Sequence, residues 1–125
     1  MANYFSRFNK EFLFDLPEEL LAKPAKERYI SIKDAVEKYG EGVEIQLIGY
    51  GININKSKDA VSERSAWVAT EEEMINVPEH QLPIIEDMMN DANAVKLARN
   101  GHFGAVIISY ENRWGTNYKF NFVEI

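Results

Sequence analysis

The residues best suited to chemistry in this 125-residue chain are aromatic side chains interleaved with lysine and arginine. Five aromatic residues fall on expected strands or on the loops between them: Tyr50, Trp67, Tyr110, Trp114 and Tyr118. Five cationic residues accompany them: Lys56, Lys58, Arg64, Arg113 and Lys119. Aromatic faces stack nucleobases and cations neutralise phosphates, so this combination is typical of proteins that bind single-stranded nucleic acid. These ten residues form the candidate nucleic-acid-binding site.

Trp114 is the most informative of these residues. It lies beside Arg113 in the loop of an expected hairpin, and side chains at the tips of turns seldom reach a core. The loop that carries the two lysines and the loop 112–115 would then flank a groove. For Trp67 and several of the tyrosines, burial in the core is the competing interpretation.

The patterns expected of an enzyme are missing from the sequence. With no cysteine, the chain has neither a thiol nucleophile nor a thiolate zinc site. His80 and His102 are not spaced as metal ligands, and the three adjacent acids at 71–73 point in different directions. The glycines at 49 and 51 lack the third glycine of a dinucleotide-binding loop. We therefore expect no catalysis, no metal and no cofactor.

The net charge of −6 argues against a simple DNA-binding protein, but the charge is unevenly distributed. The segment 71–91 carries seven of the 20 acidic residues and no lysine or arginine, which leaves 13 acids against 14 bases elsewhere. We expect this segment to be a solvated helical face. The alternative is a small acidic interaction protein, or an inhibitor that mimics DNA and acts on a host nucleic-acid enzyme. Its acids are Glu71, Glu72, Glu73, Glu79, Glu86, Asp87 and Asp91.

Length and composition indicate a single domain spanning residues 1–125. The chain is 46% hydrophobic and 12% aromatic, which is too apolar for an intrinsically disordered protein. The N-terminus has no apolar stretch typical of a signal peptide, and no run approaches the roughly 18–20 apolar residues of a membrane span. We therefore expect a cytoplasmic protein without membrane contact.

The first half of the chain predicts a strand, a turn and a short helix. Residues 10–16 alternate apolar and polar as a strand does, and residues 17–24 form a turn or a brief helical segment between two prolines. Residues 31–40 predict a helix, because Ser31 is a good N-cap and Gly40 is placed to end it.

The segment 43–54 is the most informative strand. Its apolar side chains occupy odd positions up to Leu47 and even positions from Ile48 onward. Such a change of phase around Gly49–Gly51 indicates a bulge or bend, as sheets use when they close into a small barrel. A central strand buried on both faces is the alternative.

The second half predicts one more strand at 65–70, a long helical region from 78 to about 99, and a C-terminal hairpin of strands 103–110 and 116–125. With Pro83 in the first turn of the helix, residues 78–82 form a separate turn as an alternative. We therefore expect a mainly β chain with helices, folded as an OB-like five-stranded barrel with one long helix before the hairpin. An open twisted α+β sheet is the alternative. Pairing of the edge formed by Phe120, Phe122 and Ile125 would make a homodimer.

Four segments resemble small proteins encoded by phages and mobile elements of low-GC Gram-positive bacteria, and the likeness covers roughly residues 30–125. The segments are Ser31–Val36, Val77–Leu82, Ile107–Asn112 and Asn117–Ile125. Some members of that group are regarded as single-stranded DNA-binding proteins. The resemblance implies a viral DNA-binding protein of replication or recombination, with single-stranded DNA and a host or phage replication protein as partners. The flexible acidic tail through which replication single-strand binders recruit partners is missing.

Overall fold

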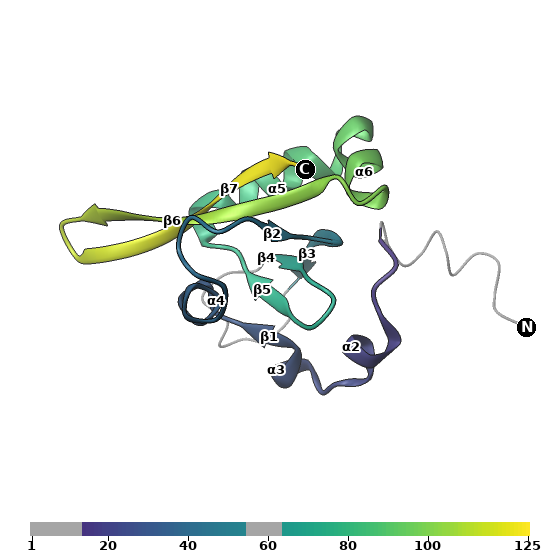
Figure 1. Cartoon of the computed structure of the whole chain (residues 1–125), viewed down its shortest axis with the longest axis horizontal. Helices are drawn as coiled ribbons and strands as arrows, with labels where there is room; N and C mark the ends of the chain where they lie inside the picture. The colour runs from purple at the N-terminus through teal and green to yellow at the C-terminus, as the bar shows by residue number, and fades with distance from the viewer. Residues whose placement is uncertain (1–13, 55–63) are drawn as a thin grey trace, which may run out of the picture.

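A computed structural model describes residues 14–54 and 64–125. The chain builds a mixed α/β fold with two sheets, of strand order β1-β5-β4-β3 and β2-β6-β7 (Figure 1). The strands are β1 Tyr29–Ile30, β2 Ile45–Gln46, β3 Gly49–Ile54, β4 Arg64–Ala69, β5 Met74–Asn76, β6 Phe103–Asn112 and β7 Gly115–Glu124. The helices are α2 Glu18–Ala22, α3 Ala25–Arg28, α4 Ile32–Tyr39, α5 Leu82–Met89 and α6 Ala92–Arg99, with a 3₁₀ turn η1 at Glu79–Gln81.

The expectation of strands combined with helices agrees with this architecture. The closed OB-like barrel is not confirmed, because the hydrogen-bonded ladders of the described residues give two separate sheets and no closed ring of strands. The four-stranded sheet also contains a parallel pair, β1 with β5, which the sequence did not indicate. Of the expected strand 10–16, only residues 14–16 are described, and they are not in a strand.

The phase change in the segment 43–54 marks the point where the chain passes from one sheet to the other. The amide of Leu47 donates to Phe103 O at 3.0 Å in the three-stranded sheet. The next amide, that of Ile48, donates to Ala69 O at 2.8 Å in the four-stranded sheet. From Gly49 onward the pairing with β4 is regular. The predicted bulge at the glycines is therefore wrong, and the interruption lies two residues earlier as a change of sheet.

The main core lies between the two sheets and the helices that cover them. Leu47, Ile75, Ile85 and Ile107 are fully buried and come from β5, β6, α5 and the link between the sheets. Helix α5 packs on β3 and β4, α6 packs on β6, and α4 contacts β5 and β7. No helix in the described part of the chain is long and apolar enough to cross a membrane.

Helix α4 confirms the helix predicted at 31–40. The Ser31 hydroxyl accepts a hydrogen bond from the amide of Asp34 at 3.1 Å, and Gly40 ends the helix with a φ of +99°. The separate turn at the start of the helical region 78–99 is present as η1, but the prediction of one continuous helix up to residue 99 is wrong. The helical region is divided into α5 and α6 because the Asp91 carboxylate accepts hydrogen bonds from the amides of Asn93 and Ala94 and so starts a new helix.

The C-terminal hairpin is confirmed and is longer than predicted. Strands β6 and β7 each have 10 residues and pair from Phe103–Glu124 to Asn112–Gly115, which leaves a two-residue turn of Arg113 and Trp114. The hairpin extends beyond the body of the protein (Figure 1). We call residues 109–119, which form this extension, the hairpin arm.

Strand β7 is an edge strand, and its middle is covered by a side chain. The Gln81 amide nitrogen donates to Phe120 O, and the Phe120 amide donates to the Gln81 side-chain oxygen, both at 2.8 Å. The amide of Ile125 donates to His102 O at 3.0 Å. Backbone groups of Phe120 and Ile125, two of the three residues expected to pair with a second copy, are thus already hydrogen-bonded within the chain.

Candidate nucleic-acid interface

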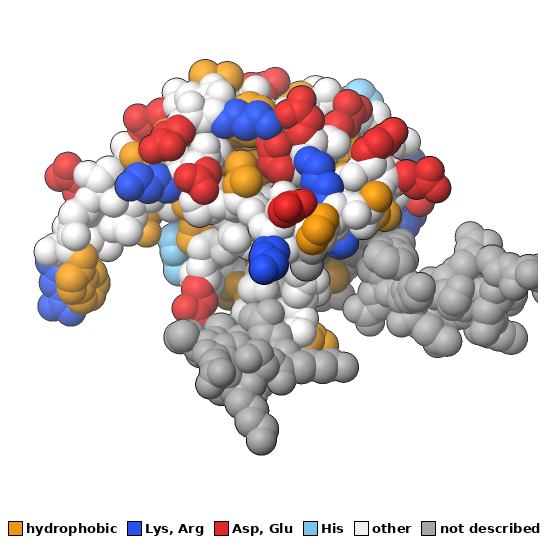
Figure 2. All heavy atoms as spheres, turned by 90° about the horizontal axis from the view of Figure 1, so that it is seen from below, with side chains coloured by type: hydrophobic (Ala, Val, Ile, Leu, Met, Phe, Trp, Pro, Cys, Tyr) orange, Lys and Arg blue, Asp and Glu red, His pale blue; other side chains and the backbone are white. Residues whose placement is uncertain are grey.

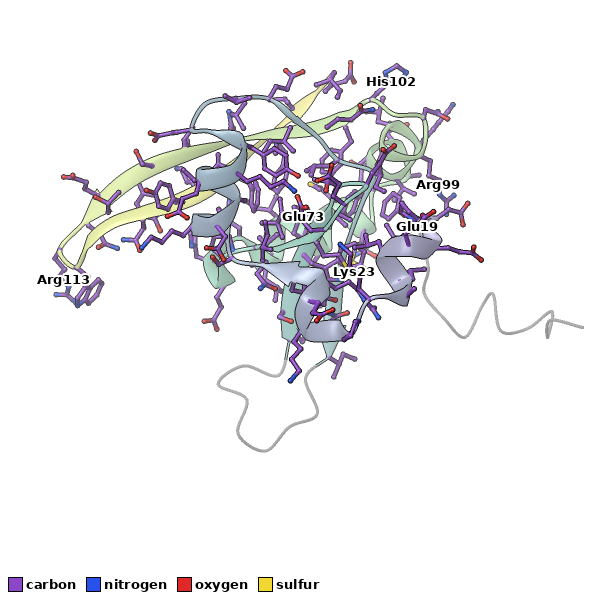
Figure 3. The ribbon with its side chains drawn as sticks, turned by 60° about the horizontal axis from the view of Figure 1, so that its bottom comes forward. Glu19, Lys23, Glu73, Arg99, His102 and Arg113 are labelled. Atoms are coloured by element: carbon purple, nitrogen blue, oxygen red, sulfur yellow. The ribbon has the colours of Figure 1, made fainter. Side chains whose placement is uncertain are left out.

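The hairpin arm brings together half of the candidate binding residues. They lie on the outer part of β6, in the two-residue turn and on the first half of β7: Tyr110, Arg113, Trp114, Tyr118 and Lys119. Figure 3 shows Arg113 at the far end of the arm, well away from Glu73 in the body. Arg113 and Trp114 are exposed at the end of this projection, whereas Tyr110 and Tyr118 are partly buried nearer the body.

The tip of the arm combines an aromatic face with a cation. Trp114 is 77% exposed, the largest exposed fraction among the exposed large hydrophobic residues. The guanidinium carbon of Arg113 lies 4.2 Å from the centre of the indole ring. The Trp114 amide donates to the Asn112 side-chain oxygen at 2.9 Å, and Gly115 adopts a φ of +118° that other residues rarely adopt. These contacts fix the turn and hold the indole outside the core.

A second aromatic–cation pair lies nearer the body. Lys119 Nζ is 5.7 Å from the centre of the Tyr110 ring, and His80 approaches the same ring edge-on with centroids 5.9 Å apart. The register places Tyr110 opposite Asn117, so Tyr110 and Lys119 share one face of the hairpin. Tyr118 lies on the other face, where it packs against the core.

Tyr50 is a core residue, and its prediction as a stacking residue is wrong. Only 1% of its surface is exposed. Its ring packs between Phe14 and Phe103, with centroid distances of 4.6 and 5.2 Å, and its hydroxyl donates to Met88 O at 2.8 Å. A nucleobase therefore has no access to either face of this ring.

Trp67 and Arg64 lie on β4, in the sheet that does not contain the hairpin. Trp67 is half-buried on β4 and lies across β3, where a methyl group added to Gly51 would come within 2.6 Å of its ring. Arg64 forms an ion pair with Glu86 of α5. Lys56 and Lys58 lie outside the described residues. The structure therefore does not gather all ten residues on one surface.

A groove runs between the arm and the body, and the sequence did not indicate it. We call it the arm-side groove; its volume is about 460 Å³, and its lining includes Ser31, Lys33, Asn76, His80, Tyr110 and Tyr118. Lys33 and Asn76 are exposed residues at the start of α4 and the end of β5. Because these segments are far from the hairpin in sequence, only the tertiary fold places them beside the arm.

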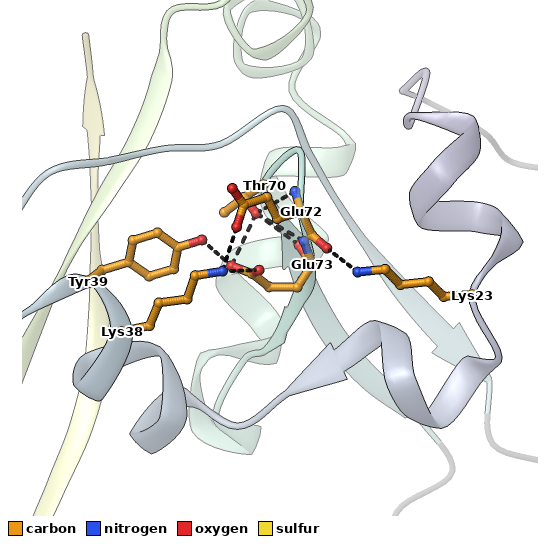
Figure 4. Close-up of polar contacts among 6 residues, drawn as sticks. All are labelled: Lys23, Lys38, Tyr39, Thr70, Glu72 and Glu73. Carbon is orange, nitrogen blue, oxygen red and sulfur yellow. Dashed lines mark hydrogen bonds and ion pairs between the residues drawn. The ribbon is translucent and has the colours of Figure 1, made fainter.

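The composition of the acidic segment 71–91 predicts a uniform solvated face, and the structure does not have one. Glu73 is buried, and its carboxylate accepts hydrogen bonds from Lys38 at 2.6 Å and from the Tyr39 hydroxyl (Figure 4). Lys38 also pairs with Glu72 at 2.6 Å. These contacts fasten α4 to the turn between β4 and β5. With the pair formed by Glu86, three of the seven carboxylates are already bound to cations within the protein.

These contacts shift several ionisation equilibria. The hydrogen bonds to Glu72 and then Glu73 raise the pKa of Lys38, and the same lysine lowers the pKa of the Glu72 carboxyl. Burial, followed by the hydrogen bond to Glu73, raises the pKa of the Tyr39 hydroxyl. In the core, burial raises the pKa of Tyr50 to about 12. All three raised groups bind their protons more tightly in the folded protein than in the unfolded chain.

The higher pKa of Tyr50 in the folded protein than in the unfolded chain predicts a loss of stability at alkaline pH. The tyrosine pKa is about 10 in unfolded chains, and that of Tyr50 is about 12 in the folded protein. The stabilisation is therefore complete below pH ~10 and is lost as the pH rises through the folded value. The free energy of unfolding, measured by urea titration, should fall between these limits. The free energy of unfolding of Tyr50→Phe should fall less steeply with pH than that of the wild type. Parallel curves for the two proteins would show that Tyr50 does not cause the loss.

The end of the arm and the body differ in surface charge. Figure 2 shows acidic and basic side chains intermixed over the visible face of the body, whereas the end of the arm carries basic and hydrophobic side chains. A second groove in the body is lined by Glu44, Glu71 and Glu72 and by no lysine or arginine. The arm carries Arg113 and Lys119 against one acid, the exposed Glu111, and the Glu41 carboxylate accepts a hydrogen bond from the Ser109 amide at its base. Its tip, with Arg113, favours an anionic ligand more than that second groove does.

Comparison with models of protein families, with curated proteins and with solved structures finds no match to this chain.

Proposed function

We propose that this protein binds single-stranded DNA through its hairpin arm and does not act as an enzyme. The observation that carries the proposal is the tip of the arm, where Trp114 is 77% exposed and stacks with Arg113 at 4.2 Å. Tryptophan and arginine are the residue types most enriched among side chains that dominate binding energy. An exposed indole with an adjacent guanidinium supports contact with a base and a phosphate at neighbouring positions of one strand.

The mode of binding is sequence-tolerant. Every base has a π face that can stack on Trp114, and Arg113 and Lys119 contact the backbone phosphates, which all sequences share. From the OB-like expectation we retain this mode of binding, and we place it on the arm instead of on a barrel face. A role in phage or mobile-element replication or recombination, with a replication protein as partner, rests on the sequence resemblance.

Fluorescence anisotropy of a labelled oligothymidine tests the proposal. The wild-type protein should bind at low salt and weaken as salt increases. Arg113→Ala and Lys119→Ala should each weaken binding and reduce the slope of log affinity against log salt by about 0.7, the value for one single-strand phosphate contact. Lys96→Ala is the matched control, because this exposed lysine lies on α6, at the opposite end of the molecule from the arm (Figure 1).

The outcomes separate clearly. The control variant should keep the wild-type slope, and the two arm variants should not. Absence of oligothymidine binding at low salt would contradict the proposal. Equal slopes for the arm variants and the control would contradict the assignment of the arm as the binding surface.

A further inference from the structure

The arm-side groove differs in charge from the rest of the molecule. Its ionisable lining residues are Lys33, His80, Tyr110 and Tyr118, and no aspartate or glutamate is among them. The chain as a whole carries 20 acids against 14 bases. A groove without carboxylates in a protein of net charge −6 favours a ligand that carries negative charge.

The groove continues directly from the tip of the arm. Thr116, the second residue of β7, lines the groove and follows Trp114 of the turn by two residues, and two residues of fully extended chain span at most about 7 Å. The tip and the near end of the groove are thus no more than roughly 7 Å apart. Successive nucleotides of a DNA strand are spaced about 3.4 Å, so a few nucleotides span this distance. One oligonucleotide can therefore contact both places.

The groove also offers polar side chains that have no partner in the described part of the protein. Lys33 forms no ion pair and the side chain of Asn76 forms no hydrogen bond with the described residues. A lysine supplies charge to a phosphate, and an amide can hydrogen-bond the edge of an unstacked base. The volume of about 460 Å³ lies within the range of small-molecule sites and leaves room for one nucleotide unit.

We propose that the arm-side groove is a second nucleotide site, in which Lys33 contacts a backbone phosphate and Asn76 the base of a nucleotide close to the one stacked on Trp114. This inference rests on the proposed function and adds the path of the strand, from the tip of the arm toward the body. An acidic peptide shares the negative charge of the ligand and is the competing occupant. The DNA strand is favoured because the groove leads to the stacked Trp114–Arg113 pair, which recognises a base and a phosphate.

Oligothymidines of increasing length test this path. Lys33→Ala should leave the shortest oligonucleotides, which only reach Trp114, bound as by the wild type. It should weaken longer ones roughly three- to tenfold and lower their salt slope by about 0.7. Lys33→Arg should restore the slope. Lys26→Ala, an exposed lysine on α3, is the matched control, and a thermal melt of each variant checks folding.

Each outcome has a distinct meaning. If Trp114→Ala weakens binding but Lys33→Ala matches the control at every length, the groove inference is overturned and the proposed function stands. If the wild type binds no oligothymidine, the proposed function itself fails. If an oligoglutamate peptide of equal charge displaces the oligonucleotide as well as unlabelled DNA does, the groove is a peptide site and the inference is overturned.

Discussion

Replacing Trp114 by alanine should weaken the binding of oligothymidine by about 1–3 kcal/mol, the usual cost of losing one stacked base. The melting temperature should hardly change, because a side chain that is 77% exposed contributes little to folding. Binding and stability should therefore respond separately to this substitution. That separation distinguishes a binding residue from a structural one.

Titration with a labelled oligothymidine and a thermal melt of each protein check this expectation. Trp67→Phe is the matched control, since it removes the other tryptophan, which is half-buried on β4 away from the arm. In the control background the intrinsic fluorescence reports Trp114 alone, and DNA should quench it. Normal binding by Trp114→Ala together with a much lower melting temperature would show that Trp114 supports the fold and that the arm is not the DNA-binding surface.

Replacing Gln81 by alanine should lower the free energy of unfolding by roughly 2–6 kcal/mol. The substitution leaves the buried N–H and C=O groups of Phe120 without partners, and each unsatisfied buried group costs about 1–3 kcal/mol. Urea denaturation measures the change. Gln46→Ala is the matched control, because the exposed side chain of Gln46 makes one hydrogen bond to the described residues, to Gly101 O at 3.3 Å.

Gln81→Glu refines this test through its pH dependence. A carboxylate can accept from the Phe120 amide but repels the Phe120 carbonyl, whereas a protonated carboxyl group can donate to that carbonyl. Burial and this repulsion should raise the folded-state pKa of the new group above its unfolded value of about 4.3. Stability relative to the wild type should thus be highest below that pH and decrease as the pH rises through the folded value. A difference that does not depend on pH would contradict this role of Gln81.

Local features of the fold could be predicted from the sequence, because neighbouring residues determine them. Ser31 and Gly40 delimit α4 through their own hydrogen bond and dihedral angle. The hairpin followed from two alternating segments and a short polar loop. Its exposed Trp114 followed from the position of that residue in the turn.

Features that depend on distant residues could not be predicted in the same way. The alternation in the segment 43–54 showed that the buried side changes, but the change of sheet at Leu47 and Ile48 depends on acceptors in β6 and β4. Alternation also could not tell whether Tyr50 faces a core or a ligand, since both require an aromatic residue on one side of a strand. The helix break at Asp91 was hidden because the apolar spacing continues across α5 and α6.

The passage of the chain from β2 to β3 has a consequence for cooperativity. Consecutive amides, those of Leu47 and Ile48, belong to different sheets, so no loop separates the two hydrogen-bonded ladders. Because one peptide unit joins the two ladders, we expect the Leu47 and Ile48 amides to exchange their protons with solvent at similar rates, as groups that open together do.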